Sequence, residues 1–303
     1  MIPRRWKPGL VLSRYLPNAL ADEKPTKYVL FAKQRSGSTW IIDLLNSHRD
    51  VVGYSELFDY ECWGKDELVG GKVGVLSWNS FVADFHAEHN REPNRAEQVS
   101  LYPAYLHCVL TMGAMGTPSQ WVKDPPTHHK WRKAGENSAK AVGFKLMYNQ
   151  AISHPAIPRY LQNNNVHCIH LIRRNHLDGI VSHEAVANRG FAHAGKKADA
   201  QATKIDAASI VMRIKRRAAD VRAGQEFARF LRLPTIEIFY EDLKEDLSGM
   251  SQVLEFLGVD PSPERLKSKL KKMSSNSHRD TIANYDEVAA ALKGTEFESL
   301  LRP

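Results

Sequence analysis

The stretch from residue 28 to residue 56 constrains the fold more than any other part of this 303-residue chain. Residues 28–32 (YVLFA) form a short apolar run with aromatic and β-branched side chains, which predicts a buried strand. A polar loop centred on Gly37 follows, and from Thr39 onward the apolar residues recur at helical spacing. A second short strand is expected over residues 50–55. The order strand, tight loop, helix, strand is typical of the first unit of an α/β fold with a parallel sheet.

The loop between this strand and this helix has the composition of an anion site. The first N–H groups of a helix lack intrahelical partners, and the helix dipole makes this end positive. Gly37 lets the backbone approach a ligand closely, and Arg35 adds a fixed positive charge. Ser38 and Thr39 add hydroxyl groups. Because these features coincide, the stretch predicts a phosphate or sulfate site, although it lacks the GxxxxGK[ST] loop of nucleotide-binding proteins.

A second strand that runs into cations lies further along the chain. Residues 166–172 (VHCIHLI) predict a buried strand, and a helix is expected from about residue 177 to residue 188. Arg174 follows the strand, and Ser182 comes eight positions later. Ser182 therefore lies two turns into the helix, which allows its side chain to face back toward Arg174. The strand, the cations and the helix start repeat the arrangement of an anion site.

The remaining strong patterns extend the sheet. Residues 141–147 predict a strand in which Lys145 marks either an end that reaches a cleft or an edge of the sheet. Residues 235–239 predict the last strand. A long helix is expected over residues 206–232, and its basic side chains at 213, 215–217 and 222 predict a solvated face.

These patterns predict a single α/β domain over residues 1–303, with a P-loop-like central parallel sheet of about five strands flanked by helices. Residues 1–26 are expected to form an N-terminal arm. Residues 57–140 carry four tryptophans and helical patterns, which predict a helical insertion on one side of a cleft.

Composition narrows the class of protein. The net charge of +8 suits an anionic ligand, although nucleic acid or a membrane surface would explain it equally well. The three cysteines (Cys62, Cys108 and Cys168) are odd in number and show no CxxC spacing, which indicates a reducing compartment. No segment has the length and apolar character of a signal sequence or a membrane span, so a cytoplasmic protein is expected. Neither an HExxH motif nor a cysteine cluster is present, so no metal site is expected.

Both anion motifs resemble those of one enzyme family. The loop of Arg35, Ser-Gly and Ser-Thr-Trp resembles the 5′-phosphosulfate loop of sulfotransferases that use 3′-phosphoadenosine 5′-phosphosulfate (PAPS). Arg174 and Ser182 resemble the family's 3′-phosphate motif. The Tyr-Glu-Asp-Leu step that begins at Tyr240 is similar to the family segment in which a tyrosine lies near the adenine. The resemblance covers most of residues 27–290, and two motifs in the family's order are more specific than either alone.

The resemblance implies which residues bind PAPS and which carry out the transfer. The implied nucleotide-binding residues are Arg35, Ser36, Gly37, Ser38, Thr39, Trp40, Arg174, Ser182 and Tyr240. Arg35 stands where the cytosolic branch has a lysine, and its implied role is to stabilise the leaving phosphate. Several branches use a glutamate shortly after the first helix as the base, and Glu56 fits that position. The rival bases are His48, His107, His128 and His129.

The implied activity is in-line transfer of a sulfuryl group from PAPS to a hydroxyl or amine of a small-molecule or carbohydrate acceptor. It implies no metal, no nucleic acid and no membrane partner. The Glu base resembles the carbohydrate and nodulation-type branch. A nucleotide-dependent small-molecule kinase shares the architecture, but the loop lacks the Gly-Lys pair. A non-catalytic anion-binding or nucleic-acid-binding protein would explain the charge, but not the paired motifs at Arg35 and Arg174. The family's C-terminal Arg-Lys-Gly stretch is absent, and residues 274–279 occupy the comparable place.

Overall fold

The computed structural model describes residues 25–58, 139–154, 156–189, 202–268, 270 and 277–302, and a few positions between 86 and 110. The predicted arm at residues 1–26 and the predicted insertion at residues 57–140 therefore lie largely outside the described residues. So do three of the four rival histidines, His107, His128 and His129.

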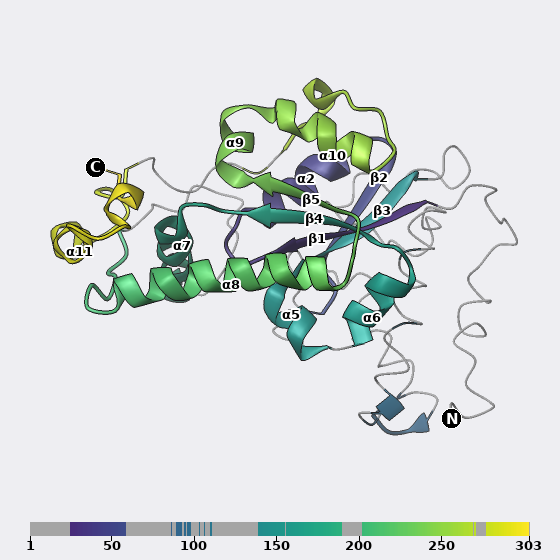
Figure 1. The fold of residues 1–303 in the computed structure, drawn as a ribbon, viewed down its shortest axis with the longest axis horizontal. Helices are drawn as coiled ribbons and strands as arrows, with labels where there is room; N and C mark the ends of the chain where they lie inside the picture. Colours follow the sequence, from purple (N-terminus) through teal and green to yellow (C-terminus); the bar gives the residue numbers. More distant parts are fainter. Residues whose placement is uncertain are drawn as a thin grey trace, which may run out of the picture.

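Within the described residues, five parallel strands form one sheet in the order β2-β3-β1-β4-β5 (Figure 1). The strands are β1 (Thr26–Ala32), β2 (Val51–Glu56), β3 (Ala141–Met147), β4 (His167–Ile172) and β5 (Thr235–Phe239). This arrangement confirms the predicted α/β fold with a parallel sheet of about five strands.

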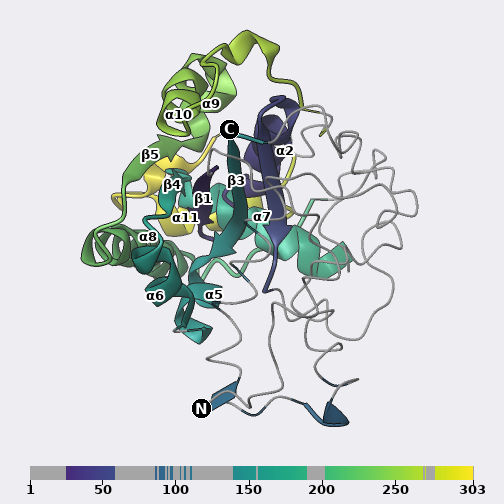
Figure 2. The same cartoon turned by 90° about the vertical axis from the view of Figure 1, so that its right-hand side faces the viewer.

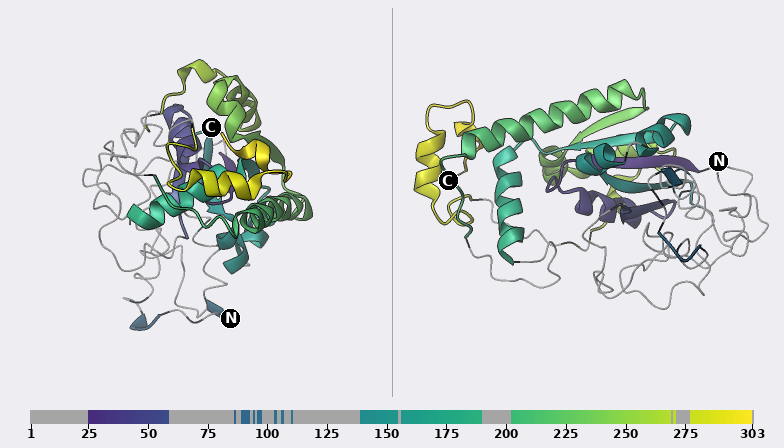
Figure 3. Two further views of the ribbon diagram at one scale, coloured as in Figure 1. Left: turned by 90° about the vertical axis from the view of Figure 1, so that its left-hand side faces the viewer. Right: turned by 90° about the horizontal axis from the view of Figure 1, so that it is seen from below.

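Helices cover both faces of the sheet, as the view along the strands shows (Figure 2). On one face lie α2 (Ser38–Ser47), α9 (Tyr240–Glu245) and α10 (Met250–Phe256), and on the other α5 (Tyr148–Ser153), α6 (Ala156–Asn163) and α8 (Ile210–Phe230). Beyond the carboxyl ends of the strands lie α7 (His176–Arg189) and α11 (Tyr285–Leu292) (Figure 3). Short 3-10 turns occur at Leu247–Gly249, Pro263–Arg265 and Glu298–Leu300.

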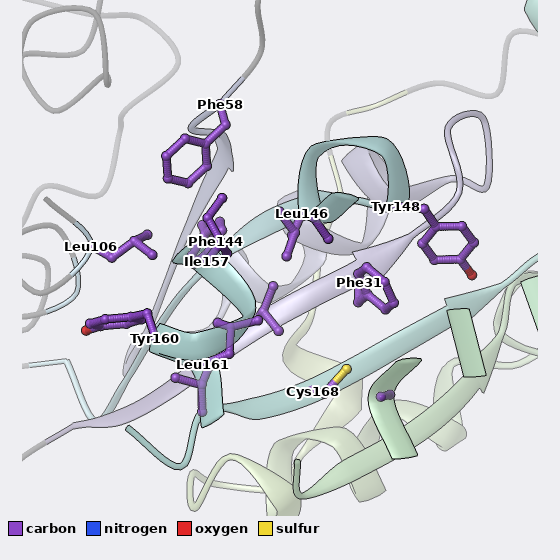
Figure 4. Close-up of a cluster of buried hydrophobic side chains, with 14 of the residues drawn as sticks. Phe31, Phe58, Leu106, Phe144, Leu146, Tyr148, Ile157, Tyr160, Leu161 and Cys168 are labelled. Carbon is purple, nitrogen blue, oxygen red and sulfur yellow. The ribbon is translucent and has the colours of Figure 1, made fainter. Parts of the chain in front are cut away.

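The core consists of two apolar layers, one on each face of the sheet. Alternate residues of β1 enter opposite layers: Phe31 packs toward α5, α6 and α8, and Leu30 packs toward α2 and α10. The layer that contains Phe31 also holds Phe144 from β3 and Cys168 from β4 (Figure 4). Because β1, β3 and β4 are covered on both faces, their sequences read as continuous apolar runs. A third cluster joins α7 and α8 to α11 and so attaches the C-terminal segment.

The topology places the two predicted anion loops side by side. After β1, the chain builds β2 and β3 on one side of β1, and then crosses to build β4 and β5 on the other. Ala32, the last residue of β1, pairs in register with Met147 of β3 and Leu171 of β4, so the carboxyl ends of the three strands meet. Such a reversal of strand order creates a crevice at the carboxyl ends, where ligands bind in open α/β sheets.

A chain of hydrogen bonds runs under α8, from a buried tyrosine and histidine to an exposed glutamate. The Tyr148 hydroxyl lies 2.6 Å from His170 Nε2, and His170 Nδ1 lies 3.3 Å from a carboxylate oxygen of Glu237. Gln225 of α8 donates to the same carboxylate at 3.0 Å. His170 is fully buried. Burial lowers the pKa of His170, and the contact with Glu237 opposes that effect only in part.

The free energy of unfolding is therefore expected to fall as the pH drops below about 6.5, the ordinary histidine value. The folded pKa of His170 lies below its unfolded value, so the unfolded chain takes up the proton first, and acid favours unfolding. Urea denaturation between pH 7.5 and 5.5 should show this loss in the wild-type protein and a smaller loss in His170→Gln. The other histidines titrate in both proteins, so parallel stability curves would show that His170 is not responsible.

Candidate active site

The loop after β1, residues 33–37, has an unusual backbone. We call it the Gly37 loop. Two of its residues adopt the left-handed conformation: Arg35 has a φ of 64° and Gly37 has a φ of 90°. The Ser36 hydroxyl donates to the carbonyl oxygen of Lys33 at 2.6 Å and closes the turn. Gly37 is the N-cap of α2, and it has no side chain to occupy the N–H groups of the first turn. The loop therefore presents the start of α2 to the crevice without a competing cap from that residue.

Tyr240, directly after β5, packs against this loop. A Cβ atom on Gly37 would lie 2.5 Å from two ring carbons of Tyr240, so a glycine permits this close approach. The ring of Trp40 meets the Tyr240 ring edge-on at 5.7 Å between centroids. The guanidinium of Arg173 lies 4.7 Å from the centroid of the Tyr240 ring. Three of the predicted nucleotide-binding residues thus come together in one contact.

Positive charge accumulates around the Gly37 loop. Arg35 Nε donates to the Ser182 hydroxyl of α7 at 3.0 Å, which joins the two predicted anion motifs. Burial and the neighbouring charge of Arg173 both lower the pKa of Arg35, and Glu56 opposes them. A cation destabilised by like charge gains when an anion binds beside it. The electrostatics of the loop therefore favour an anionic ligand.

Arg174 has a different environment from Arg35. Its guanidinium binds both carboxylate oxygens of Asp242 at 2.6 Å and stacks 4.0 Å from the centroid of the Phe239 ring. The side chains of Arg174 and Asp242 are 51% and 56% exposed, and exposed ion pairs contribute only about 0–1 kcal/mol. An incoming anion can therefore displace Asp242 at little cost. In the contacts of the described residues, Ser182 bonds to Arg35 and Arg174 bonds to Asp242.

Glu56 lies at the end of β2 in a network that reaches the start of α2. The β2–β3 register is irregular between Tyr54 and Glu56, and this irregularity sets Glu56 opposite Lys145. One carboxylate oxygen of Glu56 lies 2.8 Å from Lys145 Nζ, and the other accepts from Gln150 Nε2 at 2.8 Å. Lys145 Nζ also donates to the Thr39 hydroxyl at 3.2 Å. The predicted base is therefore linked through Lys145 to the first turn of α2, directly after the Gly37 loop. Lys145 lies on an interior strand and not at an edge of the sheet, and its side chain is buried against these two partners.

Residues 25–302 match the model of the sulfotransferase domain. The chain belongs to the sulfotransferase family. It is an enzyme of that family, which sets aside the kinase and the non-catalytic binding protein as alternatives. No curated protein matches the sequence of this sulfotransferase.

Two solved structures are similar to this sulfotransferase over most of the chain. A sulfotransferase from Alicyclobacillus acidocaldarius is 14% identical, with 94% of this chain and 98% of that one covered and a TM-score of 0.41. The sulfotransferase domain of the Synechococcus PCC 7002 olefin synthase is 17% identical, with 91% and 89% covered and a TM-score of 0.37. The assignment to the family depends on the domain match alone.

Sequence reasoning missed Arg217 of this sulfotransferase. The prediction of a solvated basic face on α8 is wrong at this position, because Arg217 is only 8% exposed. It shares the buried stripe of α8 with Ile210, Ile214 and Val221, at intervals of four, three and four residues. That spacing was visible in the sequence, but the charge of Arg217 hid it.

Two further predicted positions, His48 and the segment 274–279, have structural contacts. His48 is at the end of α2 remote from the Gly37 loop, where its ring bonds to the backbone of Asp50 and Asp260. Of residues 274–279, His278 donates to Asp178 of α7 at 2.7 Å. Among the residues that the structure describes, no group of three histidine, cysteine or acidic side chains can hold a metal ion. None of the helices in that part of the chain has the length and apolar character to cross a bilayer.

Gly37→Ala is expected to destabilise the sulfotransferase by more than Gly294→Ala. Both glycines have a positive φ, which costs an alanine about 1–2 kcal/mol. Space is open around Gly294, whereas the new methyl group at Gly37 would collide with Tyr240 and add about 1–3 kcal/mol. Urea denaturation of the two variants measures the difference. Equal losses would show that Tyr240 does not press on the Gly37 loop.

Proposed function

We propose that this sulfotransferase moves a sulfuryl group from PAPS to a hydroxyl or amine of a small-molecule or carbohydrate acceptor. The observation that supports this most is that the cationic Gly37 loop and the Glu56 carboxylate, which Lys145 holds, lie near each other at the carboxyl ends of the strands. Transfer from PAPS needs both parts, because negative charge leaves with the 5′-phosphate and the acceptor must lose a proton.

The Gly37 loop is the proposed site of the 5′-phosphate. The N–H groups of residues 36–39 and the hydroxyls of Ser38 and Thr39 hold the phosphate oxygens, and Arg35 lies where negative charge grows as the sulfur–oxygen bond breaks. Arg35 remains charged throughout, so its role is electrostatic. Trp40 and Tyr240 supply aromatic faces near the nucleotide, and the resemblance to the family favours Tyr240 beside the adenine.

Arg174 is the proposed ligand of the 3′-phosphate, with Ser182 as the second ligand from the family motif. The guanidinium of Arg174 already binds two oxygens of one carboxylate side by side, and the same fork fits two oxygens of a phosphate. Asp242 then acts as a temporary partner that a phosphate replaces.

Glu56 is the proposed base. Lys145 and Gln150 each occupy one of its oxygens, but every carboxylate oxygen has two lone pairs. Glu56 therefore keeps acceptor capacity toward the crevice and can take the proton of an acceptor hydroxyl as its oxygen attacks sulfur. Lys145 contacts both Glu56 and Thr39, and so fixes the position of the base relative to the proposed phosphate site. A glutamate in this role supports our proposal that the enzyme is of the carbohydrate and nodulation-type branch. Residues 57–140 then supply the acceptor side of a single domain.

Adenosine 3′,5′-bisphosphate, the product form of PAPS, is expected to bind the wild-type protein more tightly than adenosine 5′-monophosphate does. Arg174→Ala should lose that preference, because a charge-assisted contact to phosphate is worth about 1.5–3 kcal/mol. Asp242→Asn should tighten binding of the bisphosphate, since it removes the competing carboxylate. Titration calorimetry measures all three.

Arg229→Ala provides the control for that experiment, because Arg229 also forms an exposed ion pair, with Glu226 on α8. It should bind both nucleotides as the wild type does. An Arg174→Ala protein that still prefers the bisphosphate by the wild-type margin would exclude Arg174 as the 3′-phosphate ligand. A wild-type protein that binds neither nucleotide would refute the proposed donor.

Glu56→Gln should slow sulfuryl transfer by ~10²–10⁴-fold, the usual contribution of general-base catalysis, and should leave binding of the bisphosphate nearly intact. Glutamine keeps the shape of the side chain but cannot take the proton. Single-turnover kinetics with PAPS and a phenol acceptor measure the chemical step. Turnover within a few-fold of the wild type would move the search for the base to His107, His128 and His129.

A further inference from the structure

We propose that Arg217 and Arg173 are positioning residues that orient the Gly37 loop for the 5′-phosphate by binding two consecutive carbonyl oxygens of the loop. Arg217 Nη2 donates to the carbonyl oxygen of Gln34 at 2.6 Å. Arg173 Nη1 donates to the carbonyl oxygen of Arg35 at 3.2 Å. The inference rests on the proposed function, because the loop is assigned to the phosphate next to the transferred group.

Peptide geometry turns these two contacts into an orientation of N–H groups. A peptide unit is planar and trans, so the C=O of one residue and the N–H of the next point in opposite directions. Binding of the Gln34 and Arg35 carbonyls by the two guanidinium groups therefore turns the N–H groups of Arg35 and Ser36 away from those groups. The two fixed peptide planes lie on either side of the Arg35 Cα atom, so together they determine its backbone conformation.

That conformation needs support from outside the loop. Arg35 is a non-glycine residue with a φ of 64°, and left-handed conformations of such residues cost about 1–3 kcal/mol. Such strain persists only where the surroundings hold it in place. Charge-assisted hydrogen bonds to the carbonyls on both sides of Arg35 provide that support.

Two residues of α7 hold the two guanidinium groups in place. Gly179 of α7 faces Arg217, and a Cβ atom there would lie 2.5 Å from Arg217 Cζ. Arg173 Nη2 donates to Asp178 of the same helix at 2.9 Å. Burial disfavours the charge of Asp178, but the hydrogen bond from His278 and two arginine charges hold its pKa far below the ordinary value. The first turns of α7 thus leave room for one guanidinium and fix the other.

Burial of Arg217 is difficult to explain as packing alone. A buried cation loses hydration, and an apolar side chain of similar volume often stabilises a protein as well or better. Burial first, and then the charge of Arg173, lower the pKa of Arg217 to about 10. The hydrogen bond to the Gln34 carbonyl gives this charge a function that an apolar side chain could not perform.

Two variants test this role by different routes. Arg217→Met removes the guanidinium and keeps an unbranched apolar stem. Gly179→Ala keeps the charge of Arg217 but fills the space that its guanidinium occupies beside α7. Alanine is a better helix former than glycine, so this change does not weaken the helix itself. Arg216→Met is the matched control, because Arg216 is exposed and adjacent on the same helix.

The measurement is the ratio of affinities for adenosine 3′,5′-bisphosphate and adenosine 3′-monophosphate, which isolates the contribution of the 5′-phosphate. Arg217→Met and Gly179→Ala should each reduce this ratio by at least about tenfold, since N–H contacts to a phosphate are charge-assisted. Affinity for the 3′-monophosphate should stay at the wild-type level, and Arg216→Met should leave both affinities unchanged. A purely structural role would instead lower the unfolding temperature without changing the ratio.

The outcomes separate this inference from the proposed function. A wild-type protein without a preference for the 5′-phosphate overturns the proposed function and the inference with it. A wild-type preference that both folded variants retain overturns the inference alone. If Arg217→Met fails to fold, Arg217→Lys takes its place, because lysine keeps the charge but lacks the guanidinium fork. Loss of the ratio in folded Arg217→Lys and Gly179→Ala then supports the inference, and an unchanged ratio in both overturns it.

Discussion

Mutual repulsion among three arginines, one buried and two partly buried, is the constraint that organises this end of the sulfotransferase. Arg35, Arg173 and Arg217 come from three separate elements, and burial and the proximity of like charges lower the pKa of both Arg35 and Arg217. The fold offsets that repulsion with oxygen atoms: two loop carbonyls and the carboxylate of Asp178. The same hydrogen bonds that offset the repulsion therefore also hold the backbone of the Gly37 loop in place.

Strand order explains why this concentration of charge is possible. The reversal at β1 brings the carboxyl ends of β1, β3 and β4 together. A cation directly follows β1 and β4, and β3 carries a lysine two residues before its end. Lys145 comes from β3, and Glu56 from the edge strand β2 faces it. The base side and the donor side of the proposed reaction are thus joined through Lys145 and Thr39, two residues more than a hundred positions apart in the chain.

Much of this could be predicted from the sequence, and the reasons are local. The strands at 141–147 and 235–239 occur with the predicted bounds, because apolar runs with β-branched and aromatic residues are a local signal. The link of Ser182 to Arg35, and of Arg174 to Asp242, could not be read from spacing, since both depend on how α7 and α9 are placed against the sheet. Arg217 was misjudged for a related reason: a charged residue in a buried stripe becomes plausible only when its partners, the carbonyl of Gln34 and the space at Gly179, are known.

The close contact between Gly179 and Arg217 limits which substitutions this chain can accept. Positions 179 and 217 lie on different helices and share one volume: the guanidinium fills the space that a larger side chain at 179 would need. Neither position can change freely while the other stays the same. Among relatives that keep this arrangement of α7 and α8, an arginine at 217 should accompany a glycine at 179, and loss of one should accompany loss of the other. The two positions would then vary as a pair, although they lie thirty-eight positions apart in the sequence.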